Sequence, residues 1–328
     1  MQVSEIDPAF RTVFEPHRRP IIVHCYRMLG SLQDAEEIAQ EALLRAWQRQ
    51  RELNSTHAAR AWLYKIATSA CLDHLRKARR RRALPHLIAP SPSKILGVGS
   101  ATERRLWVEP APDALLEAEA DIAERPDHRV SRRESIGLAF ITALQFLSPK
   151  QRAALLLVDV LGWAPEEAAD LLATSTFSVN SLLQRARKGM AARRDTSAVP
   201  DVSSVDTELL QRFIAAWEGG DLEALAALLA DDARLSMPPQ LEWYAGRESV
   251  RAFFEAIWSQ QPGQRRLLPL GANGGLAVAI YRRPLGPDAT YESSGIMLIA
   301  LRAGRISEMT RFGFTNLFPL FGLPSQLA

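Results

Sequence analysis

The sequence predicts a multidomain protein in which two all-α domains precede one α+β domain. Apolar residues recur at helical spacing over residues 8–82 and again over residues 133–194. Between them, residues 83–132 contain recurrent prolines, glycines and serines and lose the apolar period, so we expect a flexible linker there. From about residue 205, two helical segments precede a run of strand-like segments, the order typical of an α+β domain with a curved sheet.

Composition narrows the classes of protein and site. Cys25 and Cys71 are the two cysteines in 328 residues, which excludes a disulfide framework and a cysteine-based zinc cluster. No apolar stretch is long enough to span a bilayer and the first residues lack a signal-peptide pattern, so we expect a cytoplasmic protein. We also expect no metal and no cofactor. The net charge is only +3, but basic residues concentrate at 76–82 and 185–194, which favours a polyanionic partner.

The first all-α domain contains three helical segments. Pro16 and Pro20 lie in the first segment, and we expect them to bend or restart it. Ser31 is a candidate cap for the second segment, whose first turns are acidic, as suits the positive end of a helix dipole. The third segment, residues 60–82, begins with aromatic residues and ends in a dense basic run.

The third segment has one apolar face and one basic face. Lys65 and Arg76 project from the basic face, and Arg79–Arg82 extend its charge, which favours a duplex backbone through counterion release. Trp62 and Tyr64 adjoin a polar loop, where aromatic rings can stack on unpaired bases; the alternative is that Trp62 belongs to the core. The residues expected inside are Leu63, Ala67, Ala70, Cys71 and His74.

The second all-α domain ends in a sequence with the spacing of a helix-turn-helix. Ser148-Pro149 predicts one helix start within this domain. Further on, residues 165–172 and 176–190 predict two helices separated by a turn of about four residues, with Ser175 as the cap. The positions expected to be buried are Ala168, Leu171, Leu172, Val179, Leu182, Leu183, Ala186 and Met190.

The remaining positions of the last helix form a polar face that suits base edges and phosphates. They are Thr176, Ser178, Asn180, Ser181, Gln184, Arg185, Arg187 and Lys188. The alternative is an ordinary helical hairpin with a solvated face, in which the terminal Arg and Lys residues complement the helix dipole. The upstream basic cluster at residues 76–82 favours the nucleic-acid interpretation.

The α+β domain, expected over residues 205–322, lacks the usual general base near neutral pH because no histidine follows His128. Acid pairs more often cap turns or face solvent, so we expect no catalytic residues among its carboxylates. These carboxylates are Asp231, Asp232, Glu242, Asp288, Glu292 and Glu308. The large side chains expected mostly in the core, some of them able to line a ligand pocket, are Trp217, Trp243, Tyr244, Phe253, Phe254, Trp258, Met297 and Phe312. The tail, residues 314–328, either docks elsewhere or completes this domain's own core.

Three stretches of the chain resemble regions 2 and 4 of bacterial sigma-70 family sigma factors, most closely the small extracytoplasmic-function (ECF) group. They are "DAEEIAQEALLRAW", "RAWLYKIATSACLDHLR" and "LSPKQRAALLLVDVLGW…EEAADLLATSTFSVNSLLQRARKGM". The last domain is similar to SnoaL-like (nuclear-transport-factor-2-like) domains through "FIAAWEGGDLEALAALLADDARLSMPP…WYAGRESVRAFF". The resemblance therefore implies region 2 over residues 8–82, region 4 over residues 133–194, and a SnoaL-like domain over residues 205–322.

The resemblance also implies roles for particular positions. Asp34, Glu36 and Glu37 match the acidic motif that engages the clamp helices of the polymerase β′ subunit. The residues assigned to the −10 element are Asn54, Ser55 and His57 in the loop that captures a flipped base, with Trp62, Lys65, Arg76, Lys77, Arg79 and Arg80 on the following helix. The polar face of the last helix would read the −35 element. Leu182 and Gln184 stand where basic or aromatic residues are frequent in the family.

The resulting interpretation is a non-enzymatic RNA polymerase sigma factor that binds core polymerase (β′ clamp helices and β flap) and promoter DNA and directs transcription initiation. Its third domain would modulate activity in cis. Two alternatives are a SnoaL-type cyclase or isomerase fused to a DNA-binding module, and a stand-alone helix-turn-helix repressor. The acidic segment 34–37 disfavours the repressor, and the missing histidine disfavours the enzyme. The sequence identifies no ligand of the third domain and no anti-sigma factor.

Overall fold

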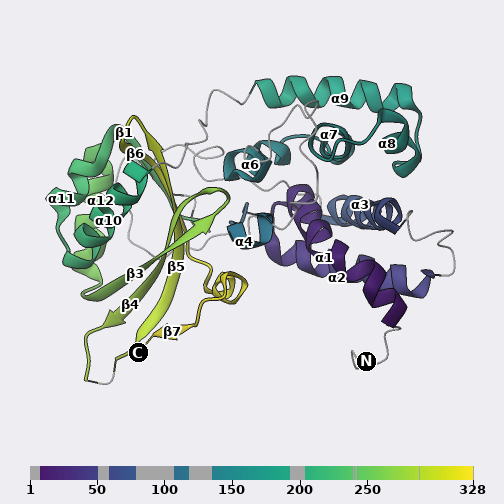
Figure 1. Cartoon of the computed structure of the whole chain (residues 1–328). Helices are drawn as coiled ribbons and strands as arrows, with labels where there is room; N and C mark the ends of the chain where they lie inside the picture. The colour runs from purple at the N-terminus through teal and green to yellow at the C-terminus, as the bar shows by residue number, and fades with distance from the viewer. Residues whose placement is uncertain are drawn as a thin grey trace. The chain divides into compact units, whose positions relative to one another are not determined.

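The computed structural model divides the chain into two compact units (Figure 1). Unit 1 comprises Met1–Arg82 and Ala114–Ser197, and unit 2 comprises Ala83–Asp113 and Ala198–Ala328. The structure describes residues 8–50, 59–78, 107–117, 135–192, 204–238, 240, 242–287 and 289–327. None of the described helices is both long and apolar enough to cross a membrane.

Unit 1 begins with three mutually packed helices: α1 (Pro8–Leu29), α2 (Leu32–Gln48) and α3 (Ala59–Ala78). Ser31 caps α2 as expected, its Oγ accepting a hydrogen bond from the Asp34 N–H at 3.1 Å. The expected restart at Pro16 or Pro20 is wrong, because α1 runs through both as one helix. Its second half, residues 21–29, is almost entirely buried, so packing holds the helix despite the missing donors.

A second group of helices completes unit 1. Ser148 forms a capping box with Gln151, whose side chain accepts from the Ser148 N–H at 3.0 Å, so the predicted helix start is confirmed. A short π-helical segment follows directly, and its hydrogen bonds shift by one residue relative to an α-helix. The elements are α6 (Leu138–Gln145), α7 (Pro149–Leu155), the π-helix η6 (Leu156–Val160), α8 (Pro165–Leu171) and α9 (Thr176–Ala191).

Buried polar contacts join the two helix groups within unit 1. Arg27 of α1 is 1% exposed and donates to the Ser135 carbonyl at 3.2 Å and to its Oγ at 2.9 Å. Arg152 of α7 donates to the Met28 carbonyl and to Gln145 Oε1. Gly30 has a φ of +71°, and a Cβ there would lie 2.9 Å from the Gln145 side chain. The two expected all-α domains therefore form one unit. Buried hydrogen bonds and the close approach of Gly30 to Gln145 hold the two helix groups together.

Unit 2 contains a curved sheet of seven strands in the order β2-β1-β6-β5-β4-β3, with β7 added to β5. Helices α10, α11 and α12 lie on one face of this sheet, where an apolar core forms (Figure 1). The strands are β1 (Leu229–Ser236), β2 (Trp243–Ala245), β3 (Gly263–Ala272), β4 (Gly275–Pro284), β5 (Tyr291–Arg302), β6 (Arg305–Phe312) and β7 (Gln326–Leu327). The helices are α10 (Ser204–Gly219), α11 (Leu222–Leu228) and α12 (Arg247–Gln260).

Part of the expected flexible linker is held by unit 2. Ala111 and Asn273 exchange two hydrogen bonds, from the Ala111 N–H to Asn273 Oδ1 at 2.9 Å and from the Asn273 N–H to the Ala111 carbonyl at 3.0 Å. Asp113 Oδ1 accepts from the Gly274 N–H at 2.7 Å. Trp107 and Val108 are buried. Residues 107–113, hereafter the docked linker, thus bind the tip of the β3–β4 hairpin. The short helix α4 (Asp113–Leu116) follows, and linker residues 83–106 and 118–132 lie outside the described ranges.

The tail packs within unit 2. The 3-10 helix η8 (Thr315–Phe321) contributes the fully buried Leu317 and Phe318, and the Phe318 ring meets Tyr281 edge-on at 5.2 Å. Tyr281 Oη donates to the Pro324 carbonyl at 2.8 Å. Of the two alternatives for the tail, the structure favours completion of the domain's own packing.

Candidate nucleic-acid interface

The helix-turn-helix is formed by α8, a short turn and α9. Ser175 Oγ accepts from the Ser178 N–H at 3.2 Å, which confirms the predicted cap of α9. Ala173 in the turn has a φ of 49°, a conformation that non-glycine residues rarely adopt. The buried positions observed are Ala168, Leu171, Val179, Leu183 and Ala186, whereas Leu172, Leu182 and Met190 are only half-buried.

The polar face of α9 is presented largely as expected. Asn180, Gln184, Arg185 and Lys188 are exposed along one side of the helix. Thr176, Ser178 and Ser181, nearer its N-terminus, are half-buried. In a helix-turn-helix the N-terminal residues of the second helix contact base edges, so this face offers amide and guanidinium groups where DNA bases are read.

Arg187 has a protein partner that its expected role as a DNA contact did not include. Its guanidinium donates two hydrogen bonds to the Asp159 carboxylate of η6, at 2.7 and 2.9 Å, and Asp159 is 4% exposed. These hydrogen bonds raise the pKa of Arg187 further, so its guanidinium stays charged at neutral pH. Arg187 therefore holds α9 on η6, while its side chain remains 35% exposed.

The sequence interpretation overlooked Phe177. This second residue of α9 is 84% exposed, the largest exposure of any bulky apolar side chain that the structure describes. The helical period does not assign a position at the start of the helix to either face, so the sequence alone did not identify it. In the structure, the exposed Phe177 ring lies at the N-terminal end of the polar face. Phenylalanine is a side-chain type that can contact the methyl group of thymine.

Helix α3 presents a basic edge. Lys65, Arg76 and Lys77 are exposed, and Arg76 forms a surface pair with Asp73 at 3.1 Å. Such a pair is weak and leaves Arg76 available to phosphates. The other residues expected at the −10 element, Asn54, Ser55, His57, Arg79 and Arg80, lie outside the described residues.

The two aromatics of α3 have different surroundings. Trp62 is half-buried and lies 6.1 Å from the Phe14 ring, so part of its surface remains accessible. Tyr64 is 1% exposed and packs edge-on against His24 and Trp163. Tyr64 is thus a core residue of unit 1, and Trp62 is the one aromatic of this pair able to meet a base.

The acidic motif lies at the start of α2. Glu36 and Glu37 are exposed, while Asp34 lies 3.3 Å from His74 Nε2 and is partly covered. One position that sequence reasoning missed continues this surface. Leu44, 42% exposed and two turns after Glu37, gives the acidic face an apolar element.

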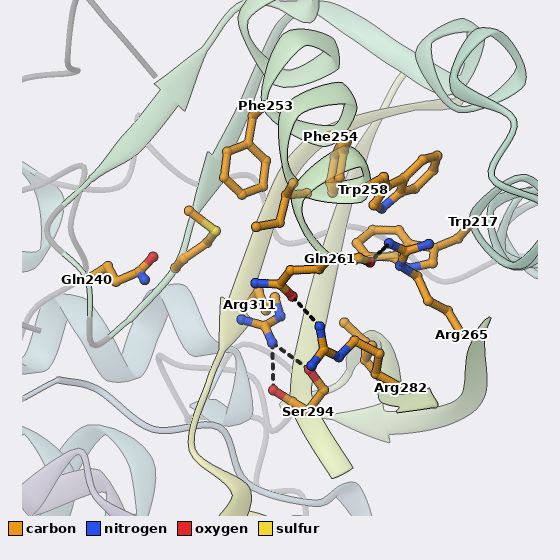
Figure 2. Close-up of a pocket in the computed structure, with 13 residues that line it drawn as sticks. Trp217, Gln240, Phe253, Phe254, Trp258, Gln261, Arg265, Arg282, Ser294 and Arg311 are labelled. Atoms are coloured by element: carbon orange, nitrogen blue, oxygen red, sulfur yellow. Dashed lines mark hydrogen bonds between the residues drawn. The ribbon is translucent and has the colours of Figure 1, made fainter. Parts of the chain in front are cut away.

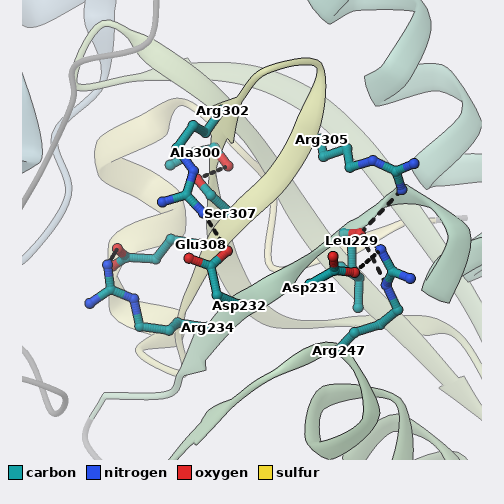
Figure 3. A network of polar contacts seen from close by, with 10 residues as sticks. All are labelled: Leu229, Asp231, Asp232, Arg234, Arg247, Ala300, Arg302, Arg305, Ser307 and Glu308. Atoms are coloured by element: carbon teal, nitrogen blue, oxygen red, sulfur yellow. Dashed lines mark hydrogen bonds and ion pairs between the residues drawn. The ribbon is translucent and has the colours of Figure 1, made fainter.

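Two of the carboxylates considered for catalysis in unit 2, Asp231 and Asp232, form surface ion pairs (Figure 3). Asp231 lies 2.7 Å from Arg247 and is 92% exposed, and Asp232 pairs with Arg302. The hydrogen bond from Arg302 lowers the pKa of Asp232, so this carboxylate is ionised at neutral pH. These groups sit at the surface, as the sequence interpretation expected of paired acids.

Comparison with known families gives three matches along the chain. Residues 13–81 match Sigma-70 region 2, residues 137–190 match Sigma-70, region 4, and residues 210–309 match the SnoaL-like domain family.

Known proteins match this chain over most of its length. The ECF RNA polymerase sigma factor SigG of Mycobacterium tuberculosis H37Rv is 43% identical over 321 residues, covering 95% of this chain and 83% of SigG. SigJ of the same organism is 32% identical over 236 residues, covering 71% of this chain and 63% of SigJ. The crystal structure of M. tuberculosis SigJ aligns with a TM-score of 0.60 and 24% identity over 96% of this chain and 99% of that chain, a likeness of fold. The helix-turn-helix, the acidic helix and the cone-shaped third domain thus occur together in a chain that belongs to the ECF group of RNA polymerase sigma factors.

Proposed function

We propose that this sigma factor binds core RNA polymerase through the acidic face of α2 and promoter DNA through α3 and α9. In this proposal, residues 8–82 act as region 2, residues 133–194 as region 4 and residues 205–322 as a regulatory domain. The observation that carries it is the seating of α9: three buried apolar residues and the Arg187–Asp159 pair fix the helix, and its exposed face carries base-reading groups.

The polymerase contact is assigned to Glu36, Glu37 and Leu44. The two carboxylates are exposed and lie in the first turns of α2 beside the helix N-terminus. Charged residues at the rim of an interface mainly set the encounter rate and the choice of partner. Leu44 would add an apolar contact that contributes to affinity. Asp34 is assigned to positioning through His74, since its carboxylate is already engaged.

The −35 contact is assigned to Asn180, Gln184, Arg185 and Phe177, with Lys188 on phosphate. The amides can pair with adenine, the guanidinium with guanine, and the Phe ring with a thymine methyl. The −10 contact is assigned to Trp62 with the basic edge of α3, together with Asn54, Ser55 and His57 outside the described residues.

Modulation in cis is assigned to the docked linker. The segment that joins region 2 to region 4 is hydrogen-bonded to the β3–β4 hairpin of the SnoaL-like domain. A domain that binds the connection between two DNA-binding parts biases which of their separations are populated. Pocket and surface geometry also favour a non-enzymatic role, because the carboxylates of β1 are paired at the surface. The fused cyclase and the stand-alone repressor remain the competing functions.

The experiment is reconstituted transcription and pull-down with core polymerase. Reversing Glu36 and Glu37 to Lys together should weaken holoenzyme formation about tenfold or more at low salt, and less as salt screens the contact. Replacing Glu248 and Glu255 of α12 by Lys makes the same change in charge elsewhere and serves as the control. Equal retention of core polymerase by both folded double variants would remove the α2 assignment.

A further inference from the structure

Unit 2 contains a cavity that the promoter-recognition function does not use. It lies between α10, α12 and the helix-covered face of the sheet, has a volume of about 100 Å³, and is partly open to solvent (Figure 2). An enclosed cavity of roughly 150 Å³ can take up a benzene molecule, so this smaller space limits a ligand to about one ring, with part of the ligand at the open side. Its walls differ in chemistry from one side to the other.

One wall is aromatic. Trp217 of α10 lies 4.8 Å from the Phe254 ring and 5.9 Å from the Trp258 ring, both edge-on, and both partners come from α12. Phe253 continues the same wall. Fixed aromatic faces of this kind bind a flat apolar group with little loss of side-chain freedom.

The opposite wall carries three arginines from three strands, with amide and hydroxyl groups between them (Figure 2). Arg282 of β4 donates to Gln261 Oε1 at 3.0 Å, and Arg311 of β6 donates to Ser294 Oγ at 2.9 Å and to its carbonyl at 2.6 Å. Arg265 of β3 donates to the Gln261 carbonyl and lies over the Trp258 ring at 5.2 Å. All of these acceptors are neutral.

No ion pair among the described residues compensates the charges on this wall. Arg282 is the direct cross-strand partner of Arg265 on β3, a placement that is unfavourable for like charges. Its partner on β5 is Glu292, which is exposed and forms no ion pair with it. Burial, with a smaller contribution from the neighbouring Arg282, lowers the pKa of Arg311 to about 10. Within the described part of the chain, no Asp, Glu or His lines the cavity and no carboxylate pairs with any of the three guanidinium groups. An anion entering this space would neutralise a repulsion that the fold otherwise retains.

A further donor faces no acceptor. Trp217 is 4% exposed, and its Nε1–H is buried without a hydrogen-bond partner among the described residues. Buried donors of this kind are normally satisfied, by the protein or by a bound molecule. We propose that the cavity binds a small aromatic carboxylate, with its ring against Trp217 and Trp258 and its carboxylate on Arg282 and Arg311.

The direct test is binding to the full chain without polymerase or DNA, so the outcome is independent of promoter recognition. Benzoate and phenylacetate are the probe ligands, and their binding to the protein is measured by calorimetry. Benzamide is the neutral match in shape, and acetate is the anion without a ring. We expect the aromatic carboxylates to bind at least tenfold more tightly than benzamide and acetate. The aromatic wall would hold the ring and the arginines would hold the carboxylate, and each control ligand lacks one of these two groups. Equal binding of benzoate and benzamide, or no binding of either carboxylate at millimolar concentration, would overturn the proposal.

Two adjacent arginines of β4 provide matched variants. Arg282→Gln removes a guanidinium from the cavity wall and should weaken benzoate binding about tenfold or more. Arg283→Gln makes the same change one residue along, where the guanidinium lies over Tyr291 outside the cavity lining, and should leave binding unchanged. Circular dichroism confirms that both variants fold. If Arg282→Gln bound benzoate as well as the parent chain, the carboxylate would not sit on this wall.

Discussion

His24 shows how one side chain makes unit 1 sensitive to acid. It is 1% exposed, its Nε2 lies 2.9 Å from Thr68 Oγ1, and its ring packs edge-on against Tyr64. Desolvation, with a smaller contribution from Arg27, lowers the pKa of His24 to about 3. In the unfolded chain this pKa returns to about 6.5, so as the pH falls the unfolded chain takes up the proton first.

The folded state therefore loses stability as the pH falls from about 6.5 towards 3, by up to about 1.4 kcal/mol for each pH unit. Replacing His24 by Gln keeps a hydrogen-bonding group near Thr68 and removes the titration. We expect urea unfolding of the parent chain to weaken more steeply between pH 6.5 and 4.5 than that of His24→Gln. Parallel pH curves for the two proteins would show that folding leaves the pKa of His24 unchanged.

The residues most difficult to predict are those whose partners are distant in sequence. Apolar spacing correctly assigned Val179, Leu183 and Ala186 to the interior, because a helix face is a local property. The ion pair of Arg187 was not predicted, because Asp159, 28 residues away, is not recognisable as its partner from sequence. Asp34 was treated like Glu36 and Glu37 for the same reason, since His74 lies on another helix.

At the scale of elements, α9 depends on the Arg187–Asp159 pair for its placement. Replacing Arg187 by Met leaves a nearly buried carboxylate unpaired and should lower the free energy of unfolding by roughly 1–3 kcal/mol, the pair being partly exposed. Adding Asp159→Asn should restore part of that loss. Arg185→Met should cost little stability but weaken promoter binding.

Chemical denaturation and promoter binding separate these roles when measured on the parent chain, the three variants above and the Asp159→Asn single variant. If Arg187→Met retained full stability and lost only DNA affinity, Arg187 would be a DNA contact after all. The coupling between positions 159 and 187, obtained from the double variant, measures how much of the seat of α9 this pair provides.

Strands were predicted unevenly for a physical reason. The β3–β4 and β5–β6 hairpins are antiparallel neighbours, and their apolar alternation and turns are visible in the sequence. Strand β1 pairs in parallel with β6, about 75 residues further on, and the sequence interpretation assigned neither it nor the three-residue β2. The helix start at Ser148 was predictable because its capping box is complete within four residues.

At the scale of the whole molecule, the size of unit 1 limits how far apart α3 and α9 can lie while its two helix groups stay in contact. The −10 and −35 elements are roughly 25 base pairs, or about 80 Å, apart along B-form DNA. The longest helix of unit 1 has 22 residues and spans about 33 Å. We therefore expect the contacts of Arg27 and Arg152 between the helix groups to break when α3 and α9 engage both elements.

Release of the docked linker should favour that opening. Replacing Asp113 and Asn273 by Ala removes the side chains that bind the linker to the hairpin tip. We expect this double variant to raise run-off transcription at limiting sigma concentration several-fold, because fewer contacts restrain the separation of the two regions. Gln264→Ala, at the other end of β3, is the control. Transcription equal to the parent chain across concentrations would remove the docked linker from regulation.

The docked linker also imposes an order in time. Ala111 and Asn273 are 162 residues apart, so at about 5–20 residues per second the ribosome makes the second partner roughly 8 to 30 s after the first. During that interval both helix groups of unit 1 have been synthesised, while the hairpin that binds their connection has not. Every newly made molecule therefore passes through a stage in which both helix groups exist before the Ala111–Asn273 hydrogen bonds can form.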